Sequence, residues 1–261
     1  MLTDSLRMES SVNPEAIINF AVQEAAKVEA ALKKANSPAD LKRVTCSLHR
    51  RIDELFVYSL NASGQKIDCR SGCSFCCYFK VDAQPHEIFR LVDFLRERFM
   101  DQDIAEIKAK AEANSKKTVN MSAEQQMTTN IPCPLLKDDK CICYEARPIM
   151  CRKHHSRDVS LCRQMFHNPS LELPNAEIAQ ISIPLAAVIT MAQGAYGRKK
   201  YDARPYDLSS ALFEALSNPK CEKRWRDGKS AFPKTALAKE PSDLESELPS
   251  VMASNGNNEG V

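Results

Sequence analysis

Apolar and polar positions alternate along most of this chain with the period of an α-helix. Apolar residues recur three and four positions apart over residues 14–35 and again over 38–60. A side chain that caps helices, followed by a proline that a first helical turn tolerates, precedes each stretch at 13–14 and 37–38. The pattern therefore predicts that residues 1–64 form an N-terminal helical hairpin.

The helical period returns further along the chain. Residues 85–100, 181–196 and 208–217 carry apolar positions at this spacing, and 103–116 continues as a charged surface helix. The polar stretch 118–131 has no clear period and is expected to be a surface connection. The repeated apolar β-branched runs of a parallel sheet are missing from the sequence, so we expect a mostly α protein.

Composition restricts the class of protein. With 261 residues, 43% of them hydrophobic, the chain can bury a sizeable core, so it does not need the cross-links on which very small domains depend to fold. A net charge of +2 argues neither for nor against nucleic acid, and the scarcity of glycine, seven in all, disfavours a nucleotide-binding α/β fold. Residues 1–10 lack the apolar core of a secretory signal, and no run approaches the ~18 apolar residues of a membrane span. We therefore expect a cytoplasmic protein without a membrane partner.

Cys69 to Cys77 is the stretch with the strongest chemical signal, because it holds four thiols in nine residues. In a reducing compartment the eleven cysteines of the chain are expected to be metal ligands or buried thiols rather than disulfides. The spacing of Cys73 and Cys76 lets one turn bring two sulfurs to one ion, and Gly72 suits the positive φ of such a turn. Adjacent Cys76 and Cys77 diverge, so both cannot easily bind one mononuclear ion, and one of them needs a second metal, a multinuclear cluster or the core.

A second group of thiols follows beyond a helical insert and consists of Cys133, Cys141, Cys143 and Cys151. Residues 137–140, between its first two members, predict a turn. The eight thiols of both groups exceed one tetrahedral site. Two zinc sites, one dinuclear site, or an iron–sulfur cluster such as [4Fe–4S] with spare structural cysteines each agree with this number. The expected cofactor is thus an iron–sulfur cluster or zinc.

The segment 147–163 is basic, with five Lys and Arg residues against one acid, and it adjoins Cys151. Four thiolates around Zn²⁺ or a doubly positive cluster leave a net charge of about −2. Basic side chains of this segment are expected to compensate that charge and to donate hydrogen bonds to sulfur. An ordinary basic surface loop and an anion-binding surface for phosphate or nucleic acid are the alternatives.

The order of these motifs resembles a known family. The first motif is Cys69-x2-Gly72-Cys73-x2-Cys76-Cys77, the second is Cys133-Pro134-Leu135-Leu136, and the third is Cys141-x2-Tyr144-x2-Arg147-Pro148-x2-Cys151-Arg152. Together they are similar to the YkgJ-like cysteine-cluster (CxxCxxCC) family, whose members are described as zinc- or iron-chelating. The resemblance covers roughly residues 67–155.

The resemblance implies a metal or iron–sulfur centre with seven cysteine ligands, and it places Arg147 and Arg152 at the cofactor. The implied ligands are Cys69, Cys73, Cys76, Cys77, Cys133, Cys141 and Cys151. Cys143 stands where the family usually has an aliphatic residue, so we expect a packed thiol there. Whether Cys162, His154 or His155 also binds metal is left open by the sequence.

The resemblance implies less about activity. A non-catalytic metal-binding protein, in which the centre joins distant helices and chelation would unfold the core, is the first hypothesis. One relative, the flagellin lysine N-methylase, indicates a second, an S-adenosylmethionine-dependent methyl or group transferase with a cleft beside the cluster. Nucleic-acid binding through 147–163 and 220–226 is the weaker alternative. A protein partner is compatible with each hypothesis.

Cys69-x3-Cys73-x2-Cys76 also satisfies the radical S-adenosylmethionine pattern. Those enzymes resemble a barrel of alternating strands and helices in which the motif follows the first strand, whereas here it follows a helical hairpin. Cys77 and the second cysteine group stay unexplained by that interpretation. We therefore disfavour radical chemistry, although the spacing indicates that three of these thiols can hold an iron–sulfur cluster.

These observations divide the chain into four parts. We expect the hairpin at 1–64, a cysteine-cluster metal-binding domain at 65–168, C-terminal helices at 169–232 that pack on it, and a disordered tail at 233–261. Trp225 is expected to pack inside the protein rather than to stack on a base. The expected fold is thus a small helical domain built around a cysteine-ligated centre.

Overall fold

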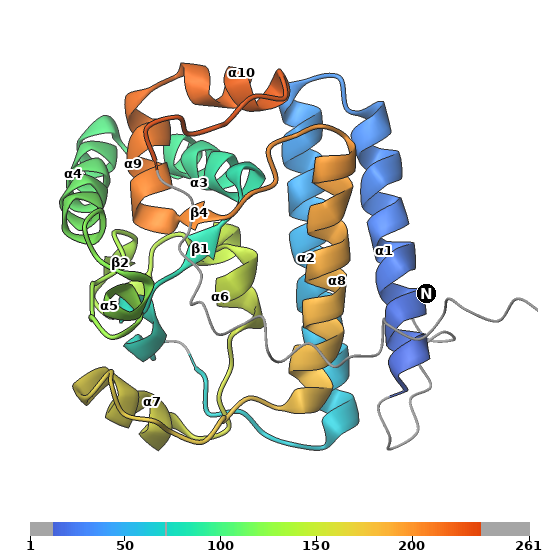
Figure 1. The fold of residues 1–261 in the computed structure, drawn as a ribbon, viewed down its shortest axis with the longest axis vertical. Helices are drawn as coiled ribbons and strands as arrows, with labels where there is room; N and C mark the ends of the chain where they lie inside the picture. The colour runs from blue at the N-terminus through green and yellow to red at the C-terminus, as the bar shows by residue number, and fades with distance from the viewer. Residues whose placement is uncertain (1–12, 71, 236–261) are drawn as a thin grey trace, which may run out of the picture.

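The computed structural model describes residues 13–70 and 72–235, and it is mostly helical, as predicted, with 64% helix. In the described residues, ten α-helices accompany two small antiparallel sheets. Figure 1 shows three long helices standing side by side as one layer, with the shorter helices grouped beside it. The three are α1 (Pro14–Lys34), α2 (Pro38–Ser63) and α8 (Ala179–Arg198).

The N-terminal helix pair is present where the sequence predicts it. Asn13 caps α1 by accepting hydrogen bonds from the backbone of the first turn, and Ser37 does the same for α2. Gly64 ends α2 with a φ of 64°, a left-handed conformation that glycine adopts without strain. The pair packs against α8, so the hairpin contributes to the main core of the protein.

The second group of helices contains α3 (Pro85–Arg98), α4 (Asp101–Thr118), α9 (Leu208–Ser217) and α10 (Lys220–Arg226). Helix α9 packs on both α3 and α4, while α3 also contacts α2 and so connects the two groups. Trp225 of α10 is buried, with its indole N–H donating to the carbonyl of Asp202 at 3.0 Å. The prediction that this tryptophan packs inside the protein is confirmed.

Three helices in the middle of the chain were not predicted. They are the short α5 (Ala123–Met127), α6 (Ile149–Lys153) and α7 (Val159–His167). The stretch 118–131, expected to be an irregular connection, contains α5 because Ser122 and Gln125 form a capping box around its first turn. Helix α6 carries Cys151, the last member of the second cysteine group, and α7 carries Cys162.

The strands are short and lie in two antiparallel pairs. One pair joins β1 (Asp82–Ala83) to β4 (Tyr206–Asp207), and the other joins β2 (Leu136–Lys137) to β3 (Lys140–Cys141). Asp138 and Asp139 form the predicted turn of the second pair, both with positive φ, as in a tight two-residue hairpin. This hairpin places Cys141 opposite Leu136.

One hydrophobic core cluster extends through the described residues, from α1 to the segment after α10. It includes Leu48 and Ile52 of α2, Ile149 of α6 and Leu185 of α8, all with no exposed surface. The side chain of Glu87 on α3 adds a polar link by accepting the N–H of Ile149 at 2.6 Å. The cysteine-rich segments are thereby attached to the helices.

The predicted disordered tail at 233–261 lies, from residue 236 onward, outside the described residues. None of the helices in the described part of the chain combines the length and the hydropathy that a bilayer crossing requires.

Candidate metal centre

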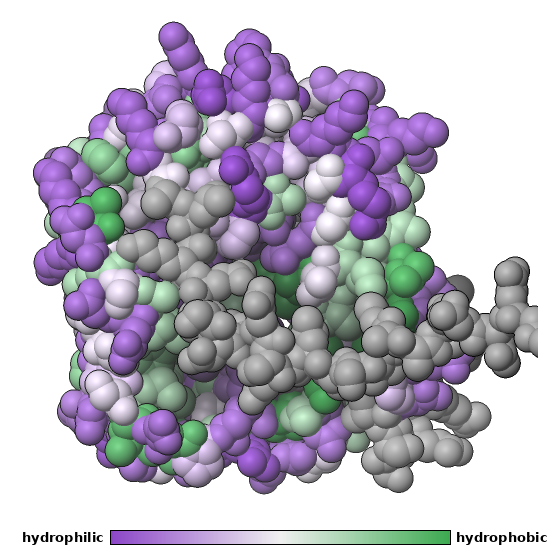
Figure 2. Space-filling model, in the orientation of Figure 1, coloured by the Kyte–Doolittle hydropathy of each residue, from purple (hydrophilic) through white to green (hydrophobic). Residues whose placement is uncertain are grey.

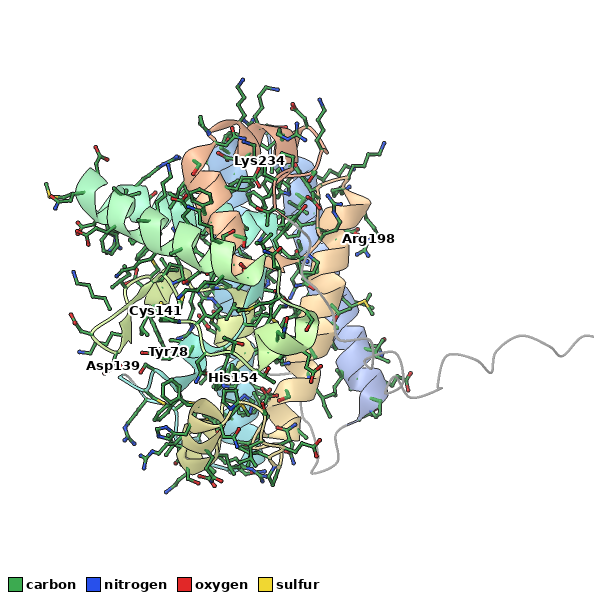
Figure 3. All side chains as sticks on the ribbon, turned by 60° about the vertical axis from the view of Figure 1, so that its left-hand side comes forward. Tyr78, Asp139, Cys141, His154, Arg198 and Lys234 are labelled. Carbon is green, nitrogen blue, oxygen red and sulfur yellow. The ribbon has the colours of Figure 1, made fainter. Side chains whose placement is uncertain are left out.

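Six of the seven predicted ligand thiols line a single cavity of about 510 Å³. Four come from the first cysteine stretch and two from the second, and they are Cys69, Cys73, Cys76, Cys77, Cys141 and Cys151. Figure 3 shows Cys141 and His154 on the same side of the molecule, away from Arg198 and Lys234. The fold thus brings together cysteines that are far apart in the sequence.

Cys133 is the one predicted ligand that does not line this cavity. Its thiol faces a smaller cavity of about 40 Å³ beside Tyr78 and Asp207. Its backbone N–H nevertheless donates to the carbonyl of Cys77 at 2.8 Å, and its thiol interacts electrostatically with Cys151 and Cys141. Cys133 therefore lies next to the other thiols, behind the wall of the main cavity.

Hydrogen bonds hold the two cysteine segments together across the cavity. The hydroxyl of Ser74 donates to Asp139 at the tip of the β2–β3 hairpin at 2.8 Å. At the other end, the N–H of Asp68 donates to the carbonyl of Ser156 at 2.9 Å. Because both ends of the first segment are attached to the second, the relative position of the thiols is fixed by backbone contacts as well as by packing.

The adjacent residues Cys76 and Cys77 share one environment. Both lie on the 3-10 helix η1 (Phe75–Tyr78), both line the cavity, and their side chains interact with each other. Of the alternatives that the sequence left open for this pair, a second metal or a multinuclear cluster agrees with this position. Gly72, just before this turn, has the predicted positive φ, 86°.

Cys76 lies between the two groups of thiols. It is the thiol whose charge acts on cysteines of both segments, and these are Cys69, Cys73, Cys141 and Cys151. An ion or cluster that engages thiols from both segments would therefore lie close to Cys76.

Four of the seven thiols accept a hydrogen bond from a backbone N–H. Such donors stabilise a thiolate and are common around cysteine-ligated metals. In three cases the donor lies two residues further along the chain, in the turn that the cysteine begins. The donors are Phe75 to Cys73, Leu135 to Cys133, Cys143 to Cys141, and Ser156 to Cys69 at 3.3 Å.

The thiols are desolvated, which favours their neutral form. Burial raises the pKa of Cys151 to about 12, and it also raises the pKa of Cys69, Cys73, Cys133 and Cys141. For Cys76 the hydrogen bond with Cys77 raises the pKa most, and burial adds to it. Thiolates are the metal-binding form, so a metal cation would displace these protons on binding.

Within 13–70 and 72–235, no group of three or more His, Cys, Asp or Glu side chains is arranged so that it could hold a metal ion. The thiols instead surround a shared space. Cysteine donors with backbone N–H groups directed at their sulfurs suit a thiolate-ligated metal or cluster, so the residues present agree with the expected kind of cofactor.

Arg147 supplies the positive charge predicted beside the thiols. Its guanidinium carbon lies 3.8 Å from the ring centroid of Tyr144, and its charge lowers the pKa of Cys141 and Cys151, although burial outweighs that effect. Its Nε is buried without a hydrogen-bond partner among the described residues. A buried donor of this kind is costly unless an acceptor such as a thiolate completes it.

Arg152 also lines the cavity, but its guanidinium is engaged elsewhere. It donates to the carboxylate of Asp53 on α2 and to the carbonyls of Arg147 and Glu145. It therefore attaches the loop before α6 to the long helix α2. Arg152 thus braces the cavity wall, with its guanidinium bonded to groups of the protein itself.

The two histidines that follow Cys151 differ in their surroundings. His155 is buried, and its Nε2 accepts the N–H of Ile178 at 2.9 Å while Nδ1 contacts the carbonyl of Lys153 at 2.9 Å. Both ring nitrogens of His155 are thus engaged by the backbone. His154 is more exposed, and its Nδ1 lies 3.7 Å from Glu177.

Cys143 and Cys162, which are not among the predicted ligands, also differ in their surroundings. Cys143 is fully buried in the hydrophobic core, as expected for a packed thiol. Cys162 is partly exposed on α7, and its charge acts on Cys69 and Cys73. Its place beside the first cysteine stretch depends on the unpredicted helix α7, so the eleven-residue gap after Cys151 gave no indication of it.

The fold and the cavity define a mostly helical protein with a cysteine-lined site. Residues 68–170 match the model of the CxxCxxCC family, whose description is "Putative zinc- or iron-chelating domain". The resemblance predicted from the cysteine motifs is confirmed, and the matched range extends beyond it to include Cys162. No curated protein and no solved structure matches the chain.

Proposed function

We propose that this protein binds a multinuclear metal centre in the cysteine-lined cavity, with an iron–sulfur cluster as the preferred form and zinc as the alternative. The single observation that supports it most is that six thiols from two distant segments line one space. The proposed ligands are drawn from Cys69, Cys73, Cys76, Cys77, Cys133, Cys141 and Cys151.

The number and spread of the thiols favour several metal atoms over one. A single zinc ion takes four ligands at about 2.3 Å from sulfur, which would leave other thiols of this cavity unused. Cys76 interacts with thiols on both sides, and Cys77 adjoins it, so a centre at this position would be within reach of both segments. An iron–sulfur cluster, held by thiolates through several irons, suits that arrangement.

The charges around the cavity favour an anionic centre. Arg70, Lys140 and Arg147 line it in addition to the braced Arg152, against Asp53 and Asp139 as the only acids of the lining among the described residues. Asp53 is already paired with Arg152, and Asp139 accepts from Ser74. The uncompensated charge is therefore positive, as a polythiolate centre of net charge about −2 requires.

The size of the cavity favours a second candidate function, small-molecule chemistry beside the metal. Its volume of about 510 Å³ falls within the range of roughly 300–1,000 Å³ typical of ligand pockets. Phe56, Val57 and Ile67 add apolar side chains to the lining of the cavity. A methyl or group transferase that uses S-adenosylmethionine is the activity that we would test first.

The experiment is anaerobic purification followed by metal and sulfide analysis and an absorption spectrum. We expect a brown protein with iron, acid-labile sulfide and a broad absorption near roughly 400 nm, as iron–sulfur centres show. A colourless protein that holds only zinc would replace the iron–sulfur form by the zinc form. A protein without stoichiometric metal would contradict the proposal as a whole.

A matched pair of variants tests the position of the centre. Cys76→Ser removes the thiol between both groups and should lower the metal-to-protein ratio by more than half. Cys221→Ser alters a buried thiol of α10, outside the cavity lining, and should leave the ratio unchanged. An unchanged ratio in Cys76→Ser would remove this residue from the site.

A further inference from the structure

Helix α7 covers the first cysteine stretch without contributing to the cavity lining. The ring of Phe166 packs against the rings of Phe75 and Tyr78, with centroids 5.6 Å and 4.8 Å away. Both rings belong to the turn that carries Cys76 and Cys77. Cys162 lies on the same helix, one turn before Phe166, and is partly exposed. The packing of α7 therefore places an accessible thiol beside the proposed centre.

The thiol of Cys162 begins a chain of polar contacts. It is hydrogen-bonded to the imidazole of His154 and to the side chain of Ser156. The Nδ1 atom of His154 lies 3.7 Å from a carboxylate oxygen of Glu177. The other carboxylate oxygen accepts the hydroxyl of Ser182 on α8 at 2.7 Å.

This order of groups is that of an activated nucleophile. A thiol, an imidazole that exchanges a proton with it, and a carboxylate that orients the imidazole recur in cysteine nucleophiles on unrelated folds. Because Glu177 engages Nδ1, the other ring nitrogen of His154 is left for Cys162. Ser182 in turn fixes the carboxylate, so the three groups are held by elements other than the proposed metal ligands.

The electrostatics agree with this geometry. The hydrogen bond to His154 lowers the pKa of Cys162 more than burial raises it, and the contacts with Cys162 and Glu177 raise the pKa of His154 to about 10. Burial opposes ionisation of Glu177, but its contact with His154 and the hydrogen bond from Ser182 lower its pKa to about 2. Other ionisable groups that act on the members of this chain are Cys69, Cys73, Cys76, Lys153, His155 and Asp158.

We propose that Cys162 is a nucleophilic thiol that forms a mixed disulfide with a small-molecule disulfide, assisted by His154 and Glu177. The sulfur of Cys162 attacks one sulfur of the disulfide, a new S–S bond forms, and the original S–S bond breaks. The departing thiolate takes the proton held by the imidazolium of His154. Two electrons stay with the leaving sulfur, so the exchange requires no further oxidant.

Oxidised glutathione is the probe for this reaction. The full-length, metal-loaded protein is incubated with it without oxygen at pH 6.5, and mass spectrometry of peptides follows the mixed disulfide on each cysteine. Cys46, a partly exposed thiol of α2, is the internal reference. We expect Cys162 to react at least about tenfold faster than Cys46, since the contact with His154 favours the thiolate of Cys162.

Two variants separate activation by His154 from a merely structural role. His154→Gln should lower the rate of Cys162 by about tenfold at pH 6.5 and move the midpoint of its pH–rate profile upward, with a smaller effect of Glu177→Gln. His167→Gln, at the end of the same helix α7, is the matched control and should leave the rate unchanged. An unchanged Cys46 rate in each variant verifies that the fold is intact.

Metal analysis distinguishes this inference from the proposed function. Cys162→Ser should retain the metal content of the natural protein, because Cys162 is bonded to His154 and Ser156 rather than facing the cavity. A loss of metal in Cys162→Ser would make Cys162 a ligand and overturn the inference while leaving the metal proposal in place. Reaction of Cys162 no faster than Cys46 would overturn it as well.

Discussion

At the scale of single residues, Arg152 is a charged side chain of the cavity lining that makes several hydrogen bonds within the protein. Its side chain is 5% exposed, whereas that of its partner Asp53 is 45% exposed. The guanidinium also satisfies two backbone carbonyls, those of Glu145 and Arg147. The two ends of the pair therefore differ. If Arg152 is removed, water can solvate Asp53 but cannot readily reach the two carbonyls.

We therefore predict that Arg152→Met lowers the free energy of unfolding by roughly 2–4 kcal/mol, since it leaves buried acceptors without donors. Asp53→Asn, the matched control at the exposed end of the pair, should cost about 1 kcal/mol or less. Urea unfolding with a chelator present measures both without a contribution from bound metal. Equal losses in the two variants would contradict the bracing role of Arg152.

His86 gives the protein a pH dependence that is independent of the cysteines. It is fully buried, stacks on Tyr196 with ring centroids 4.1 Å apart, and contacts Thr45 and Gln84. Burial lowers the pKa of His86 to about 4, whereas an unfolded histidine titrates near 6.5. Below pH 6.5 the unfolded chain binds a proton that the folded chain refuses, so stability is lost as the pH falls from 6.5 towards 4.

This linkage predicts that the natural protein loses roughly 2 kcal/mol more than His86→Gln between pH 7 and pH 5. Glutamine cannot titrate, so the difference between the two pH dependences isolates His86 from other groups. Urea unfolding at both pH values, again with chelator, provides the measurement. Parallel pH dependences would show that His86 is not held neutral in the folded state.

Several residues of the site were predictable from sequence because local rules determine them. The positive φ of Gly72 follows from its place before a tight turn, and the burial of Trp225 follows from its residue type. The burial of Cys143 was expected from the resemblance, because the family usually has an aliphatic residue at that position. The engagement of both nitrogens of His155 was not predictable. It depends on Ile178, which approaches from another segment of the chain, and no local pattern specifies that contact.

At the scale of elements, α6 is held by a carboxylate from another helix. Glu87 on α3 accepts the N–H of Ile149 in the first turn of α6 at 2.6 Å, and its other oxygen accepts the N–H of Gln84 at 2.9 Å. Burial opposes ionisation of Glu87, but the contact with His49 and other polar partners keep its pKa below the ordinary value. This buried anion caps α6 and orients Cys151 two residues further on.

Glu87→Ala should accordingly destabilise the protein by roughly 2–4 kcal/mol, because it leaves two buried N–H groups unpaired, and it should also weaken metal retention through Cys151. Glu54→Ala, on the exposed part of α2, is the control and should cost less than about 1 kcal/mol. Unfolding in chelator measures the first effect, and metal content after dialysis measures the second. A stable Glu87→Ala variant with full metal content would contradict this capping role.

The helices differ in how much of them the sequence predicted. Long helices such as α1, α2 and α8 carry many apolar positions, and α1 and α2 also begin at residues whose side chains cap them, so their pattern identifies them. Helices α5 and α6 have only five residues each, far below the length at which a helix is stable alone. They exist because tertiary contacts support them, and a pattern of so few positions cannot show those contacts.

At the scale of the whole molecule, the core and the cysteine-lined cavity are different regions. The core joins α1, α2, α3, α8 and α9 through side chains such as Leu48, Ile88 and Leu185, which have no exposed surface. Figure 2 shows polar side chains over much of the visible surface around this core. Two of the proposed ligands, Cys133 and Cys141, are partly buried and pack against this core. In a small zinc finger, the metal supports the whole fold. Here the core consists mainly of residues that are not proposed ligands, so we do not expect the whole fold to depend on the metal centre.

We predict that chelation loosens the cysteine segments and leaves the helical layer folded. Amide hydrogen exchange should rise by at least about tenfold in 67–80 and 133–163 after metal removal, because the proposed ligand bonds that join these two segments to each other are lost. Exchange in α1 and α8 should change little, since their packing against each other involves no proposed ligand. The matched control is chelator added to Cys76→Ser, whose exchange should already resemble that of the metal-free protein. A uniform rise that includes α1 and α8 would mean that the metal centre supports the entire core, and the separation of core from cavity would then be wrong.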